Sequence, residues 1–155
     1  MNISSQTLDR YIWARYPIIA IVSHEESRVM SAILELAKNM KLSNGKTAQR
    51  IVCEWSYTKG MLVISEGKDV AGIANGGDYT SPDSALEFIS KFDDSGEHAP
   101  VLFVIKDIHK ILELDIRVLR YLRDIAVRFE TRKHSMILLS PTINMPSDVE
   151  KQIAV

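Results

Sequence analysis

Hydrophobic positions along the chain follow two kinds of pattern that alternate. Short, nearly unbroken apolar runs predict strands that are buried on both faces. Segments with apolar residues every three or four positions predict amphipathic helices. The apolar runs predict strands at residues 17–22, 50–56, 61–65, 101–105 and 136–139. The amphipathic segments predict helices at residues 5–16, 25–42, 82–92, 115–132 and 146–153.

Turn-forming residues mark several boundaries of these elements. Pro17 ends the first helix, and Ser43-Asn44-Gly45 ends the second. Ser81 is the predicted N-cap of the third helix, with Pro82 at its first helical position. The glycines within residues 66–80 predict a mobile loop or an excursion at the sheet edge between the third strand and this helix.

Helices that alternate with uninterrupted apolar strands are typical of a parallel sheet with helices on both faces. We therefore predict one α/β domain over residues 1–155, a three-layer α/β/α sandwich on a mostly parallel sheet of four or five strands. In such sheets, ligands bind beyond the carboxyl ends of the strands. The residues that follow the strands are the candidates for chemistry: Ser23, His24, Glu25, Glu26, Ser56, Tyr57, Thr58, Lys106, Asp107, Ile108, His109, Ser140, Pro141 and Thr142.

Composition excludes several classes of protein. The 155 residues carry 19 Lys and Arg against 20 Asp and Glu, and a net charge of -1 gives no long-range attraction for nucleic acids or anionic membranes. Cys53 is the single cysteine, so neither an internal disulfide nor a thiolate zinc cluster can form. Signal-peptide features are missing from the N-terminus, and the apolar runs are too short for a membrane helix. We expect a soluble protein of a reducing compartment.

Particular segments add a family resemblance. Residues 100–109 read PVLFVIKDIH, like a Walker B strand, and residues 136–142 read MILLSPT, like the sensor strand that follows it. Together with IVSHEESRV, WSYTKG and LRYLRDIA, they resemble the N-terminal part of the AAA+ ATPases first described as hypothetical chloroplast reading frames. The resemblance implies a P-loop NTPase (RecA/AAA+)-like domain without a Walker A loop and of reduced nucleotide competence.

The resemblance also implies an arrangement and a context. The strands that start at Ile18 and Met136 would be neighbours, with that of Val101 next and that of Ile51 toward an edge. A further strand would begin near Ala154, and its absence would leave the edge beside the first strand open. A complete AAA+ module would follow as partner in a homo-oligomer. ATP and Mg²⁺ would belong to that module alone, in a bacterial cytoplasm or a plastid stroma.

The turn Ser23-His24-Glu25-Glu26-Ser27-Arg28 stands where a Walker A loop would be. It has no glycine to let backbone amides surround phosphates and no lysine to reach them. Glu25 and Glu26 instead occupy the positive end of the following helix, where they repel a triphosphate and Arg28 only partly offsets them. Their structural interpretation is simpler: acidic residues in the first turn stabilise a helix.

The Walker B-like segment, residues 100–109, lacks the acid that would organise a metal ion. Lys106 stands where the Asp that organises magnesium would be, and Asp107 stands at the place of the catalytic Glu. No arginine follows Arg132 to act as an arginine finger, and Ser140 and Thr142 are merely sensor-like. We therefore predict no ATP hydrolysis here and expect Lys106 to pair with Glu25 or Glu26. The enzymatic alternative is a nucleotide-binding or weakly hydrolysing domain that uses Asp107.

Two further groups allow more than one interpretation. His24 and His109, with Asp107 and Glu25, could form a metal site, but turn or capping roles are favoured and no metal is expected. Arg117, Arg120, Arg123 and Arg128 make one long helix basic on its outer face. They could bind nucleic acid, dock onto an ATPase module, or pair within the helix with Asp124. The near-zero net charge favours pairing.

The remaining reactive or aromatic side chains are interpreted as packing residues. Cys53 lies within a predicted strand and is expected to be a small buried hydrophobe rather than a nucleophile. Trp13, Trp55 and Tyr57 are expected to pack in the core and at its rim.

Overall fold

A single twisted sheet organises the part of the chain that the computed structural model describes, which comprises residues 16–38, 40–41, 47–48, 50–64, 79–92, 101–112, 116–130, 134–142 and 153–154. Six strands of these residues form the sheet: β1 (Ile18–Val22), β4 (Ile51–Ser56), β5 (Gly60–Val63), β6 (Val101–Lys106), β7 (Ser135–Ser140) and β8 (Ile153–Ala154). Their order is β5–β4–β6–β7–β1–β8, and every neighbouring pair is parallel except β4 with β5.

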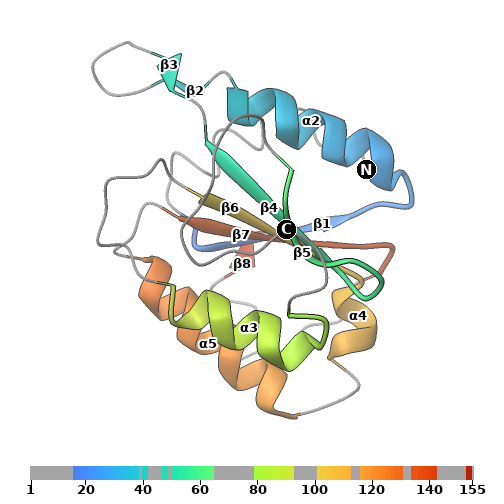
Figure 1. Ribbon diagram of the computed structural model, residues 1–155, viewed down its shortest axis with the longest axis vertical. Helices are drawn as coiled ribbons and strands as arrows, with labels where there is room; N and C mark the ends of the chain where they lie inside the picture. Colours follow the sequence, from blue (N-terminus) through green and yellow to red (C-terminus); the bar gives the residue numbers. More distant parts are fainter. Residues whose placement is uncertain are drawn as a thin grey trace.

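Helices cover both faces of this sheet (Figure 1). Helix α2 (Glu26–Lys38) lies on one face, and α3 (Pro82–Ser90) and α5 (Ile116–Phe129) lie side by side on the other. The short helix α4 (Ile108–Ile111) directly follows the end of β6. The three-layer sandwich predicted from the alternating patterns is therefore confirmed.

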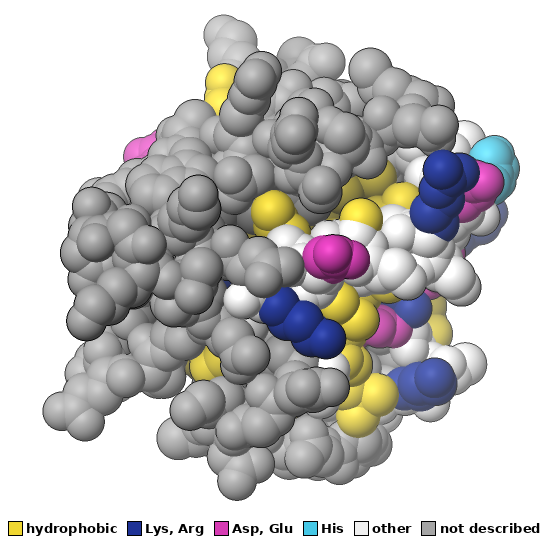
Figure 2. All heavy atoms as spheres, turned by 90° about the horizontal axis from the view of Figure 1, so that it is seen from above, with side chains coloured by type: hydrophobic (Ala, Val, Ile, Leu, Met, Phe, Trp, Pro, Cys, Tyr) yellow, Lys and Arg dark blue, Asp and Glu magenta, His cyan; other side chains and the backbone are white. Residues whose placement is uncertain are grey.

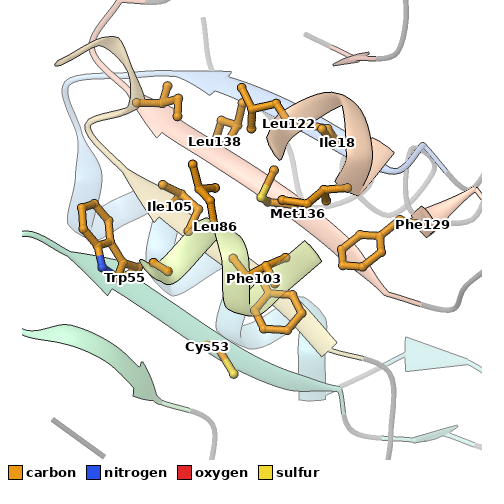
Figure 3. Close-up of a cluster of buried hydrophobic side chains, with 14 of the residues drawn as sticks. Ile18, Cys53, Trp55, Leu86, Phe103, Ile105, Leu122, Phe129, Met136 and Leu138 are labelled. Atoms are coloured by element: carbon orange, nitrogen blue, oxygen red, sulfur yellow. The ribbon is translucent and has the colours of Figure 1, made fainter. Parts of the chain in front are cut away.

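Alternate residues of each buried strand enter opposite halves of the core, as a period of two requires. Cys53, Trp55, Phe103 and Ile105 pack toward α3 and α5, while the intervening Val104 packs toward α2. Figure 3 shows how the first half divides between the two helices: Leu86 of α3 lies beside Ile105, and Leu122 of α5 lies beside Ile18. Because helices bury both faces of the sheet, the sequences of its strands are unbroken apolar runs.

The predicted strand order is confirmed for the four central strands. The register aligns Ile18 with Met136 in β1 and β7, and β6 separates β7 from β4. The expectation of an open edge beside β1 is wrong for the first two of its five residues, because β8 pairs Ile153 with Ile18 and Ala154 with Ile19. Even two residues satisfy backbone groups that an edge strand would otherwise leave unpaired.

The helix predicted over residues 25–42 is too long. Helix α2 ends at Lys38, and strand β2 (Met40–Lys41) pairs with the antiparallel strand β3 (Thr47–Ala48) in a separate two-stranded sheet. Met40 continues the helical spacing of apolar residues, which extended the prediction. The intervening sequence contains Asn44-Gly45, a dipeptide that favours hairpins as much as it ends helices.

Other predictions meet the structure only in part. The N-cap of α3 is confirmed, since the Ser84 amide donates to Ser81 Oγ at 3.2 Å. Residues 5–15 of the first predicted helix, with Trp13, lie outside the described residues, as do residues 146–152 of the last one and residues 66–78 of the glycine-rich loop. Ile153, placed at the end of that last helix, belongs to β8 instead. Among the helices of the described ranges, none is both long and apolar enough to cross a membrane.

Candidate functional site

Three chain segments meet at the carboxyl edge of the sheet. The Ser23 amide, just after β1, donates to the Ser140 carbonyl oxygen at 2.9 Å, and the Asp107 amide donates to that of Leu139 at the same distance. The Ser140 hydroxyl, in a residue only 1% exposed, accepts from the His109 amide at 3.4 Å. The turn after β1, the end of β7 and helix α4 are thereby fixed relative to one another.

The turn between β1 and α2 is held by its own side chains. Ser23 Oγ accepts a hydrogen bond from the Glu25 amide at 3.0 Å. Arg28 Nη1 lies 3.4 Å from Glu25 Oε2, and both side chains are exposed. The other side chains of the turn are exposed as well: His24, Glu26 and Ser27. Figure 2 views the molecule from the side of α2 and shows basic, acidic and histidine side chains gathered at one end of that side. Carboxylates thus stand at the start of α2, where a helix otherwise attracts phosphate.

Lys106 joins this turn to the sheet. At the end of β6, its Nζ lies 2.9 Å from Glu26 Oε1 and also contacts Glu54 Oε1 on the neighbouring strand β4. The side chains of Lys106 and Glu54 are only 18% and 14% exposed. Burial lowers the pKa of Lys106, but the hydrogen bonds and charges of Glu54 and Glu26 outweigh it and hold that pKa above its ordinary value. The ammonium is therefore held charged between two carboxylates.

The pairing of Lys106 with Glu26 confirms one of the two partners expected from the sequence, whereas Glu54 was missed. The register aligns Glu54 with Val104, two residues before Lys106, so all three side chains lie on the α2 face of the sheet. An acidic and a basic residue whose side chains point to the same face of neighbouring strands were a usable signal. Glu54 escaped attention because it lies inside a strand rather than after one.

Asp107 occupies an unusual backbone conformation at the same edge. Its φ of 61° is left-handed, a region that aspartate tolerates better than most residues, and the exposed carboxylate makes no capping hydrogen bond to α4. Tyr57 lies in the turn after β4. Its partial burial, and then the negative charge of Asp107, raise the pKa of the Tyr57 hydroxyl. The Tyr57 ring lies 5.0 Å from that of Trp55, in a tilted packing contact.

The other candidate residues of this edge do not form a ligand set. His24 is exposed, whereas Nδ1 of His109 is buried and makes no hydrogen bond. Thr142 is exposed beyond the end of β7. In the described part of the chain, no three His, Cys, Asp or Glu side chains are arranged to hold a metal ion.

The arginines of α5 have different partners. Arg117 Nη2 lies 2.9 Å from Asp83 of α3, and Arg128 Nη2 donates to the Phe92 carbonyl oxygen just beyond α3 at 2.6 Å. Arg120 pairs with Asp124 at 3.1 Å, which confirms the predicted pairing one helical turn apart. Arg123 is exposed. Arg117 and Arg128 therefore connect α5 to α3, whereas Arg120 pairs within α5.

Cys53 and Trp55 are packing residues, as expected. Both are fully buried, and burial raises the pKa of the Cys53 thiol to about 12, so no thiolate forms near neutral pH. Trp55 Nε1 donates to the Tyr79 carbonyl oxygen at 2.6 Å, which satisfies the polar atom of the indole.

Residues 4–155 match the family described as the N-terminal domain of SpoVK-like AAA ATPases. The chain belongs to this family. It is therefore an AAA ATPase N-terminal domain, which agrees with its α/β fold.

Algal proteins are among its relatives. It is 30% identical over 142 residues to an uncharacterized AAA domain-containing protein, ycf46, of Guillardia theta, covering 92% of this chain and 24% of that protein. The ycf46 protein of Pyropia yezoensis is also 30% identical over 142 residues, covering 92% of this chain and 25% of the relative. The chain thus spans about a quarter of the length of the curated relatives it matches. No solved structure gives a significant match.

Proposed function

We propose that this chain is the non-catalytic N-terminal domain of a longer AAA+ ATPase, where it serves assembly, regulation or substrate engagement of the linked ATP-hydrolysing module. The observation that carries this proposal is the closed ion-pair group at the carboxyl edge. Lys106 is held between Glu26 and Glu54, at the place where the resemblance expects the acid that organises magnesium. An ammonium already neutralised by two carboxylates neither binds a metal cation nor offers its charge to phosphate.

The surroundings of this group support the same conclusion. No glycine or lysine stands in the turn after β1, and its only arginine, Arg28, contacts Glu25. A triphosphate at the start of α2 would face Glu25 and Glu26 without a cradle of backbone amides. In the proposed protein, ATP and magnesium belong to the linked module, the assembly is a homo-oligomer, and its compartment is a bacterial cytoplasm or a plastid stroma.

Calorimetry with magnesium-ATP tests the loss of nucleotide binding. The 155-residue chain is expected to give no binding heat, and Asp107→Ala is expected to behave identically. Asp107→Ala is the informative variant because Asp107 is the exposed acid at this edge that a weakly active site would use. Saturable heat that disappears in Asp107→Ala would establish the enzymatic alternative and refute the proposal.

The proposed role in regulation or assembly of the linked ATP-hydrolysing module is tested in the full-length protein. Deletion of residues 1–155 is expected to change the ATPase rate or the oligomeric state, measured by phosphate release and sedimentation velocity. If both stay unchanged, the domain serves neither regulation nor assembly.

A further inference from the structure

Asp107 is an exposed acidic residue in a backbone conformation that glycine adopts more easily. Its φ of 61° and ψ of 38° are left-handed. Among the described residues, its carboxylate forms neither a hydrogen bond nor an ion pair. The preceding Lys106 is already bound by Glu26 and Glu54. Lys110, three positions on, does not pair with this carboxylate in the described chain either. The negative charge is therefore available to an external cation.

The backbone that carries this carboxylate is fixed on both sides. The Asp107 amide donates to the Leu139 carbonyl oxygen of β7 at 2.9 Å, and the Asp107 carbonyl oxygen accepts from the Lys110 amide of α4 at 3.1 Å. Asp107 is thus held against β7 and the first turn of α4 at once. A group on such a backbone loses little conformational freedom when it binds a ligand, and this favours affinity.

An aromatic ring lies beside the carboxylate. The register aligns Trp55 with Ile105, and Tyr57 and Asp107 each follow two residues beyond this aligned pair of neighbouring parallel strands. Partial burial and then the charge of Asp107 raise the pKa of the Tyr57 hydroxyl, so the two groups lie within electrostatic reach of each other. In the described part of the chain they form no hydrogen bond with each other.

The tyrosine ring is both accessible and supported. Tyr57 is 41% exposed, and its ring lies 5.0 Å from that of the fully buried Trp55. The indole of Trp55 is itself held by its hydrogen bond to the Tyr79 carbonyl oxygen. A carboxylate and an aromatic ring therefore lie close together at the carboxyl edge, each supported by the fold.

We infer that Asp107 and Tyr57 bind one arginine side chain of a partner polypeptide, with the guanidinium group bonded to the carboxylate and stacked on the tyrosine ring. A guanidinium group suits both residues, because it is planar, forms two parallel hydrogen bonds with a carboxylate and stacks on aromatic rings. A lysine ammonium can form the ion pair but has no planar group to stack. The site goes beyond the proposed function, since it gives a ligand to an acid that the proposed function leaves unused.

Other ligands suit these two residues less well. Magnesium prefers several oxygen ligands, and the described residues contain no group of three His, Cys, Asp or Glu side chains that could hold a metal ion. A phosphate group would be repelled by the carboxylate of Asp107. A guanine base could stack on Tyr57 and donate hydrogen bonds to the carboxylate, so guanosine belongs in the test.

Nuclear magnetic resonance of the nitrogen-15-labelled 155-residue chain tests this site. The probe is a blocked pentapeptide with one central arginine among glycines. We expect saturable shifts of the Thr58 and Ile108 amides at millimolar peptide, because one charged contact and one ring contact supply little affinity. The same peptide with citrulline, which is neutral and nearly isosteric, should give no saturable shift. The lysine peptide should bind about threefold more weakly than the arginine peptide.

Three variants assign the binding to the two side chains. Asp107→Asn should weaken binding of the arginine peptide about fivefold, since asparagine tolerates the left-handed backbone but has no charge. Tyr57→Leu should weaken it about threefold, since leucine still packs but offers no ring. Glu130→Gln removes an exposed acid at the far end of α5 and is the matched control, with unchanged affinity expected.

Several outcomes would overturn the assignment. Equal affinity for the arginine and citrulline peptides, or unchanged affinity in Asp107→Asn, would show that the carboxylate is not the receptor. Magnesium chloride or guanosine that shifts the same amides more strongly than the arginine peptide at equal concentration would assign a ligand of another class. Urea unfolding of Asp107→Asn should match the wild type. A large loss of stability there would show that the carboxylate serves the fold and not a ligand.

Discussion

At the scale of single residues, one lysine decides how the carboxyl edge is interpreted. The resemblance of residues 100–109 to a Walker B strand implies an acid at the position of Lys106, and the structure gives that lysine two carboxylate partners from two other elements. Lys106 is therefore an ion-pair partner within the fold. It connects β6, β4 and the first turn of α2.

Removal of the lysine should destabilise the fold. Lys106→Met leaves the Glu54 carboxylate, 14% exposed, without its cation, and we expect the free energy of unfolding to fall by about 2 kcal/mol. Urea unfolding measures this loss. The double variant Lys106→Met with Glu54→Gln should recover most of it, because no charge is then left unpaired. Lys38→Met, at an exposed position of α2, is the matched control and should change stability little. A full-sized loss in the double variant would show that packing, and not charge, explains the effect.

The same ion pairs predict a dependence on pH with a defined sign. The pKa of Lys106 is raised above 10.5 in the folded chain, so the protonated form is the one that folding favours. Its contribution to stability should be constant from about pH 7 to about pH 9 and should decline only as the pH rises through the raised pKa. The stability difference between the wild type and Lys106→Met isolates this contribution from other groups. A difference that already shrinks below the ordinary lysine pKa would contradict the assignment.

At the scale of elements, the capping of α3 shows how well local sequence rules can work. Ser81 and Pro82 predicted the start of this helix, and the Ser81 hydroxyl accepts the Ser84 amide as an N-cap should. Nothing about the tertiary structure was needed, because the interaction joins residues three positions apart.

Loss of this cap should have a cost that is small and local. Ser81→Ala is expected to lower the free energy of unfolding by about 1 kcal/mol, since one backbone amide of the first turn loses its acceptor. Ser31→Ala, within α2, serves as the control and should be neutral or slightly stabilising because alanine favours helix interiors. Equal effects of the two substitutions in thermal or urea unfolding would mean that the hydroxyl of Ser81 does not act as a cap.

Other elements could be predicted only as far as their patterns were unambiguous. The apolar runs around Val101 and Met136 have a single interpretation, and both strands are where the sequence placed them. Met40 fits a helical stripe and a short strand equally well, so the end of α2 could not be found from spacing. The pairing of Ile153 with Ile18 joins residues far apart in the sequence, and no local pattern contains it. Glu54 was missed for a different reason: it lies inside a strand, and only the residues that follow the strands were taken as candidates.

At the scale of the whole molecule, one sheet separates and joins the two halves of the core. In β4, Cys53 packs toward α3 and α5, whereas Val52 packs toward α2. Neither half of the core can therefore be exposed to solvent without breaking the same hydrogen-bonded strands. The described sheet should therefore unfold as one cooperative unit. The parallel pairs of β4 with β6 and of β6 with β7 extend this coupling across its centre.

Chemical labelling of Cys53 measures this cooperativity directly. The thiol is fully buried with a pKa of about 12, so in the folded chain it should resist a thiol reagent on both steric and chemical grounds. Labelling after short exposure to increasing urea should rise with the same midpoint as the loss of far-ultraviolet circular dichroism, because exposure of Cys53 requires the core to open. Lys59→Cys in a Cys53→Ser background, exposed in the turn before β5, should instead react at once without urea. Labelling of Cys53 well below the dichroism midpoint would show that the β4–β5 edge opens on its own, since β5 is bound through β4 alone among the described strands.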